Sequence, residues 1–125
     1  MKNVLLSIVL LIAMVMNASA RSTPAGTASW YGEDHRGKLM ANGKKFDPDK
    51  LTAASWFYPL GSKVRVSLNS NGTPSRSVLV TITDRGPAKR LVRNGRKIDL
   101  SEAAFKELAP PDRGLVRVTI RGGHK

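Results

Sequence analysis

One aspartate in this sequence has the setting of an acid–base residue. Asp84 directly follows the β-branched run of residues 77–83 and precedes the turn-forming pair Gly86-Pro87. A carboxyl group at the end of a strand can give a proton to a leaving group and take one back. The alternative is that Asp84 only caps the turn or pairs with the neighbouring Arg85. We predict that Asp84 is the catalytic residue.

Aromatic residues gather in two short segments, residues 30–31 and 56–58. Such rings either fill a core or stack on the apolar faces of ligands such as sugars. Core packing is predicted for Trp30 and for Phe46. The aromatic residues predicted to contact a substrate are Tyr31, Trp56 and Tyr58.

Basic side chains mark two loops, and they could bind carboxylates or simply form a solvated face. They are Lys44, Lys45, Arg85, Lys89, Arg90 and Arg93. The chain has two histidines and no cysteine, so no cluster of metal ligands is recognisable. No phosphate-binding glycine loop is present either. We therefore expect neither a metal nor a cofactor.

The N-terminal segment of the chain indicates export. A positive start, an apolar run and the small residues 17–20 are typical of a signal peptide, so residues 1–20 are predicted to be removed. Residues 21–26 would form a flexible lead-in, 27–120 one domain and 121–125 a basic tail. Without a cysteine at the cleavage site, no lipid anchor is expected, and the exported protein would be soluble in the periplasm or outside the cell.

The chain carries 21 basic and 9 acidic residues, for a formal charge of +12. This excess predicts polyanionic partners. Outside the inner membrane, these are wall carboxylates, envelope phosphates and anionic lipids, so nucleic acid is not expected.

Alternating apolar residues predict short strands at 27–31, 63–68, 77–83 and 115–120, with a short apolar step at 98–100. Ser101 is a good N-cap for a helix that ends before Pro110-Pro111. The domain is therefore mainly β, and the pattern alone leaves a small barrel and a sandwich open.

Four segments, in matching order and spacing, resemble the RlpA family. They are Ala28-Ser29-Trp30-Tyr31-Gly32, Ala41-Asn42-Gly43 with Phe46-Asp47, Leu51-Thr52-Ala53-Ala54, and Thr83-Asp84-Arg85-Gly86-Pro87 with Ile98-Asp99-Leu100-Ser101. The resemblance spans about residues 26–120. It implies a six-stranded double-psi β-barrel with one or two short helices.

The resemblance also implies lytic transglycosylase activity on peptidoglycan strands that lack stem peptides. In this reaction one acid protonates the glycosidic oxygen, and the C6 hydroxyl of the sugar closes on the anomeric carbon to leave a 1,6-anhydro end. Because no water attacks, one carboxyl group that changes from acid to base can suffice. In the resembling proteins the residue at Asp84 lies in the glycan groove.

Two positions depart from the family pattern. Lys44 stands where the family has a glutamate, and Ser55 stands where it has a histidine, and both positions are implicated in the family's catalysis. A lysine protonates a leaving group poorly near neutral pH unless its pKa falls strongly. We predict that Lys44, Ser55 and Arg85 bind substrate.

Three functions remain open at this stage. The first is an endolytic transglycosylase acting on peptidoglycan glycan strands. The second is an expansin-like module that binds the wall without cutting it, and the third is a secreted basic protein that binds other anionic polymers. A monomer is expected in each case.

Overall fold

The computed structural model of the protein describes residues 25–69 and 76–122. The predicted signal peptide, most of the lead-in and the last three residues of the tail lie outside the described residues. None of the helices in the described part is long and apolar enough to cross a membrane.

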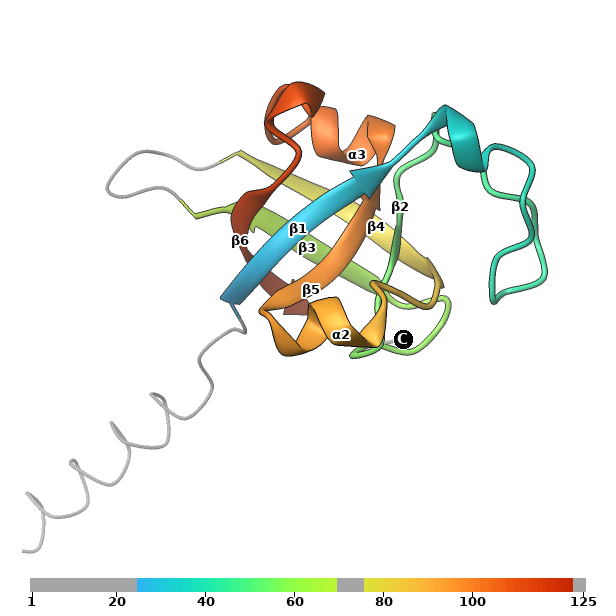
Figure 1. The fold of residues 1–125 in the computed structure, drawn as a ribbon, viewed down its shortest axis with the longest axis horizontal. Coiled ribbons are helices and arrows are strands. Elements are labelled where there is room, and N and C mark those ends of the chain that lie inside the picture. The colour runs from blue at the N-terminus through green and yellow to red at the C-terminus, as the bar shows by residue number, and fades with distance from the viewer. Residues whose placement is uncertain (1–24, 70–75, 123–125) are drawn as a thin grey trace, which may run out of the picture.

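Six strands form a closed barrel in the order β1-β5-β2-β4-β3-β6 (Figure 1). β1 runs parallel to β5, and β2 runs parallel to β4, whereas the other four pairings are antiparallel. The closure leaves no free sheet edge. The strands are β1 Ala25–Tyr31, β2 Thr52–Ala54, β3 Lys63–Leu68, β4 Ser77–Asp84, β5 Arg96–Ser101 and β6 Val116–Gly122.

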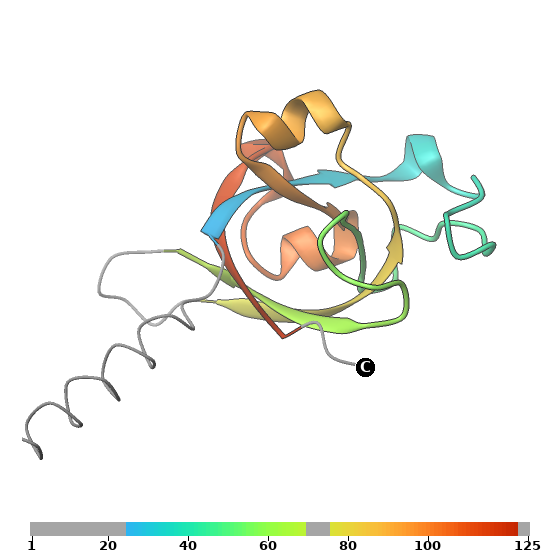
Figure 2. The same ribbon diagram turned by 90° about the horizontal axis from the view of Figure 1, so that it is seen from below.

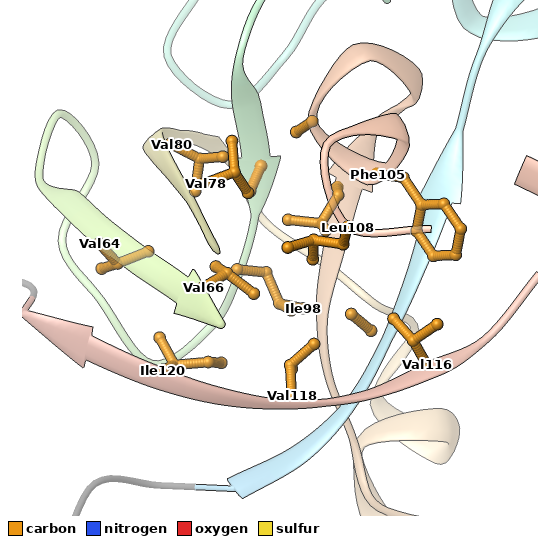
Figure 3. Packing of buried hydrophobic residues seen from close by; sticks show 14 of the residues in the cluster. Val64, Val66, Val78, Val80, Ile98, Phe105, Leu108, Val116, Val118 and Ile120 are labelled. Carbon is orange, nitrogen blue, oxygen red and sulfur yellow. The ribbon is translucent and has the colours of Figure 1, made fainter. Parts of the chain in front are cut away.

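The barrel interior is filled by β-branched and leucine side chains, because alternate residues of each strand point inward. Val64 and Val66 of β3 face Val78 and Val80 of β4 across matching register positions. Figure 3 shows these side chains converging with Ile98 and those of β6. This packed interior fixes the strand ends that carry the polar residues.

Helix α3 (Glu102–Lys106) closes one end of the barrel, with Phe105 and Leu108 in the core. Seen along the barrel, α3 lies within the ring of strands, and α2 (Lys89–Arg93) lies outside it (Figure 2). Ser101 caps α3 as predicted, since its Oγ accepts the N–H of Ala104 at 3.2 Å. Two 3₁₀ turns complete the fold, η1 (Glu33–His35) and η2 (Pro111–Arg113).

The predicted mainly β fold and its barrel form are confirmed. The pattern did not predict β2, which has three residues, or helix α2, which lies in the segment expected to be a basic loop. Trp30 and Phe46 pack as predicted: Phe46 is buried, and the Trp30 ring lies 6.3 Å from that of Phe105.

Candidate active site

Two aspartates lie on either side of the short strand β2. Ala54 pairs with Asp84 of β4 on one side and with Asp99 of β5 on the other. A Cβ added to Gly86 would lie 3.5 Å from Asp99 Oδ2, so the turn after Asp84 runs directly against Asp99. The barrel order thus joins two carboxyl groups that are 15 residues apart in the chain.

The two carboxyl groups share one open cavity of about 380 Å³. We call it the aspartate groove. Its walls also include Tyr31, His35 and Arg85, which come from β1, η1 and the turn after β4. The predicted catalytic residue therefore lies in a groove, together with an aspartate to which the sequence assigned no role.

Asp84 is held by the backbone around it. Its Oδ1 accepts the N–H of Ala41 at 2.9 Å and the N–H of Arg85 at 2.8 Å. Two donors on one oxygen fix the orientation of the carboxyl group. Through Ala41, the loop of residues 40–45 is tied to this end of β4.

Asp99 is half-buried and accepts a hydrogen bond from the Ser29 hydroxyl. Burial raises the pKa of the Asp99 carboxyl, while the Ser29 hydrogen bond and the positive charges of Arg96 and His35 act in the opposite direction. A groove carboxyl with a raised pKa has the property required of a general acid. The signal in the sequence was an acid between the core residues Ile98 and Leu100.

Tyr31 was predicted to bind substrate, and it lines the aspartate groove. Its ring stacks on Phe46 at 4.2 Å and meets the edge of His35 at 5.5 Å. Burial, followed by the charges of Asp84 and Asp99, raises the pKa of the Tyr31 hydroxyl, so it stays a donor. This hydroxyl is buried and has no hydrogen-bond partner within the described residues.

Arg85 and Ser55 support the groove. Arg85 Nη1 donates to the carbonyl oxygens of Ser55 at 2.7 Å and Tyr58 at 2.6 Å. Ser55 is 0% exposed, and its Oγ accepts the N–H of Phe57. The Ser55 hydroxyl is thus buried and engaged with the backbone in this geometry, and its role in substrate binding stays a prediction.

The second aromatic segment is only partly near the groove. Trp56 is 44% exposed and donates from Nε1 to the carbonyl oxygen of Pro87, a groove residue, with Lys89 Nζ 5.0 Å from its ring centre. Tyr58 instead lines a separate cavity with Phe57 and Lys97. The structure thus places Trp56 beside the groove and the Tyr58 side chain away from it.

Lys44 is exposed and lines a different cavity, whose wall includes the loop of residues 40–45. Its backbone N–H donates to Asn42 Oδ1 at 2.9 Å. Within the described residues, no three histidine, aspartate or glutamate side chains are placed to hold a metal ion.

Comparison with known families agrees with the barrel fold. The model of the family described as lytic transglycolase matches residues 23–120. The chain belongs to the lytic transglycolase family. The double-psi barrel and the RlpA resemblance predicted from the sequence are confirmed.

Curated relatives of this lytic transglycolase domain are named endolytic peptidoglycan transglycosylase RlpA. That of Pseudomonas aeruginosa strain UCBPP-PA14 is 42% identical over 107 residues, which are 86% of this chain and 29% of the relative. That of Neisseria meningitidis serogroup A is 38% identical over 104 residues, 83% of this chain and 41% of the relative. The chain thus spans less than half the length of these relatives.

Two solved structures share the fold. Streptomyces papain inhibitor superposes with a TM-score of 0.54 at 27% identity, covering 80% of this chain and 96% of the inhibitor. Cerato-platanin 2 from M. perniciosa also gives a TM-score of 0.54, at 16% identity, covering 79% of this chain and 94% of that protein. The second likeness concerns the fold alone.

Proposed function

We propose that this lytic transglycolase domain is an endolytic peptidoglycan transglycosylase, which cleaves glycan strands without water and leaves 1,6-anhydro-muramic ends. The observation that carries the proposal is a half-buried carboxyl group, Asp99, which lies in the same groove as Asp84 and whose pKa burial raises. The names of the relatives support the same reaction.

Asp99 is the general acid in this proposal. The sequence assigned that role to Asp84, but Asp99 is the carboxyl group whose pKa burial raises. Burial that disfavours the charged carboxylate favours the protonated form, which is the form that a general acid uses. Asp99 gives its proton to the glycosidic oxygen, which leaves as a hydroxyl of the adjoining N-acetylglucosamine.

The second half of the reaction needs no further carboxyl group. As the bond from the anomeric carbon to the leaving oxygen breaks, the C6 hydroxyl oxygen of the muramic residue bonds to that carbon. Its proton passes to Asp99, now a carboxylate, which restores the acid. Every proton that leaves the enzyme returns to it, so the cycle is complete.

Asp84 and Tyr31 hold the sugar and its developing charge. Positive charge builds at the anomeric carbon when the glycosidic bond breaks, and a fixed carboxylate nearby stabilises it. The Asp84 carboxyl is fixed by its two backbone donors. Tyr31 lines the groove, and a small shift of its ring on binding would let the partnerless hydroxyl donate to an oxygen of the bound strand.

The site of action follows from the substrate. A protein that cleaves peptidoglycan works on the wall side of the inner membrane, and the apolar run and small residues of 1–20 would direct the export. Peptidoglycan is the proposed partner, with strands that lack stem peptides as the expected substrate.

Product analysis of digested peptidoglycan tests the reaction. Purified protein is incubated with sacculi and with amidase-treated glycan, and the released fragments are identified by mass spectrometry. Fragments with 1,6-anhydro ends, 18 Da lighter than the reducing-end sugars of hydrolysis, are expected. Reducing ends alone would contradict the transglycosylase mechanism, and binding to the wall with no products would favour the non-cutting module instead.

A further inference from the structure

A second cavity, of about 700 Å³, is lined by the loop of residues 40–45 and by residues 81–83 of β4. Three lysines line it: Lys44, Lys45 and Lys50. We call this cavity the lysine pocket. It is larger than the aspartate groove, and nothing in the proposed reaction uses it.

The charge of the lysine pocket is unbalanced. None of its three lysines has an ion-pair partner among residues 25–69 and 76–122. The one acidic residue in the wall, Asp47, is engaged elsewhere, since its Oδ1 lies 3.4 Å from Arg36 Nη1 and accepts the N–H of Asp49. Three free ammonium groups around one cavity favour an anionic ligand.

Two threonines of the pocket wall have unused hydroxyl groups. The Oγ atoms of Thr52 and Thr83 are buried and lack a hydrogen-bond partner in the part of the chain that the structure describes. Thr83 is 8% exposed. Buried hydroxyl groups are normally paired, so these two are available to a polar ligand that fills the pocket.

The lysine pocket adjoins the aspartate groove. Thr83 lines the pocket, and the next residue, Asp84, lines the groove, at a point where the register of β2 and β4 shifts by one residue. Ala41 also lines the pocket, while its N–H donates to Asp84 Oδ1. A ligand group in the pocket therefore lies next to a strand bound in the groove.

We propose that the lysine pocket binds a carboxylate of the wall polymer whose glycan lies in the aspartate groove. The inference rests on the proposed function. Muramic acid carries a lactyl ether, and its carboxylate is free wherever no stem peptide is attached, whereas N-acetylglucosamine has no such group. A carboxylate site beside the groove thus distinguishes muramic residues from the other sugar of the strand.

Binding measurements with chemically altered glycan test this site. The full chain carrying Asp99→Asn, which removes the proposed general acid, is titrated calorimetrically with two ligands. They are soluble amidase-treated glycan oligomers and the same oligomers after reduction of the lactyl carboxyl to an alcohol. We expect the reduced glycan to bind about fivefold more weakly, the effect of three exposed ion pairs.

Variants locate the effect. Added to the same background, the triple change K44Q/K45Q/K50Q should abolish the difference between the two glycans. The charge-matched control R113Q/R117Q/R121Q alters exposed arginines outside the pocket and should keep it. Equal binding of acid and reduced glycan by the Asp99→Asn protein, or discrimination that survives the lysine changes, would overturn the proposal.

Peptide-bearing strands separate the two sources of carboxylate. Tighter binding of strands with free lactyl groups assigns the site to the lactyl carboxylate, and tighter binding of peptide-bearing strands, lost in the lysine variant, assigns it to the stem peptide. These experiments distinguish failure of the proposed reaction from failure of the proposed site. If the protein forms no anhydro products but its glycan binding depends on the carboxylate, only the enzymatic proposal is contradicted. If the protein forms anhydro products but its binding does not depend on the carboxylate, the enzymatic proposal stands and the carboxylate site is contradicted.

Discussion

Partial burial of the Asp99 carboxyl group, the general acid that we propose, also affects the stability of the fold. Its neighbours Ser29, Arg96 and His35 favour the charged form, but burial outweighs them and raises its pKa. Below pH 3.8, the ordinary value, the group is neutral in both the folded and the unfolded state. As pH rises through the raised pKa, the folded protein must ionise a group in a site that disfavours its charge, so the free energy of unfolding decreases.

Replacing Asp99 by asparagine should remove that penalty. As pH rises from about 4 to about 7, we expect the melting temperature of Asp99→Asn to increase relative to that of the native protein. Thermal unfolding followed by circular dichroism at several pH values measures the difference. A variant that instead loses stability relative to the native protein over this range would show that the Asp99 charge is favourable.

The partnerless hydroxyl of Tyr31 should matter for activity but not for stability. Because no described residue bonds this hydroxyl, Tyr31→Phe should leave the melting temperature unchanged or slightly higher, whereas loss of a donor to the strand should lower kcat/KM about tenfold. The rate of release of anhydro fragments measures the second effect. Tyr58→Phe, in a separate cavity, is the control and should keep full activity.

At the scale of elements, one side chain joins the segment after β2 to the turn after β4. Arg85 Nη1 bonds two backbone carbonyls, those of Ser55 and Tyr58. Arg85→Gln should destabilise the fold by about 1–3 kcal/mol, because part-buried carbonyls lose a charged donor. Chemical denaturation measures this. The exposed Arg90→Gln on α2 should change stability by less than about 0.5 kcal/mol, and an equal effect of both changes would refute the role of Arg85.

The elements that the sequence predicts well are those with a local signal. Residues 63–68 alternate over a full strand and form β3, and Ser101 begins α3 as its side-chain chemistry requires. β2 has only three residues, and its parallel pairing with β4 depends on barrel closure, which no local pattern encodes. Helix α2 has no side-chain hydrogen bond at its N-cap, so no capping residue in the sequence indicates where it begins.

The same difference between local and long-range signals explains which residues of the candidate site could be predicted. Asp84 could be predicted because it ends a long strand and precedes a recognisable turn. Asp99 reaches the groove only because β5 and β4 flank β2 in the barrel, and its raised pKa comes from burial in the folded protein. The burial of Ser55 and the distance of Lys44 from the groove likewise depend on backbone paths that composition does not reveal.

For the whole molecule, the formal charge of +12 dominates long-range behaviour. Attraction to anionic wall polymers is screened by salt, since the Debye length falls from about 10 Å at 0.1 M to about 3 Å at 1 M. Sedimentation with insoluble wall should therefore decrease steadily with salt concentration. Binding that is indifferent to salt would show that contacts in the groove, rather than charge, hold the protein on the wall.

The most direct test of the account compares native protein with Asp99→Asn on amidase-treated glycan. Mass spectrometry of the fragments counts the 1,6-anhydro ends formed per unit time, and circular dichroism verifies that both proteins are folded. Loss of the general acid should lower the rate about 100-fold or more while glycan binding persists. An Asp99→Asn protein that forms anhydro ends at the native rate would contradict the central claim.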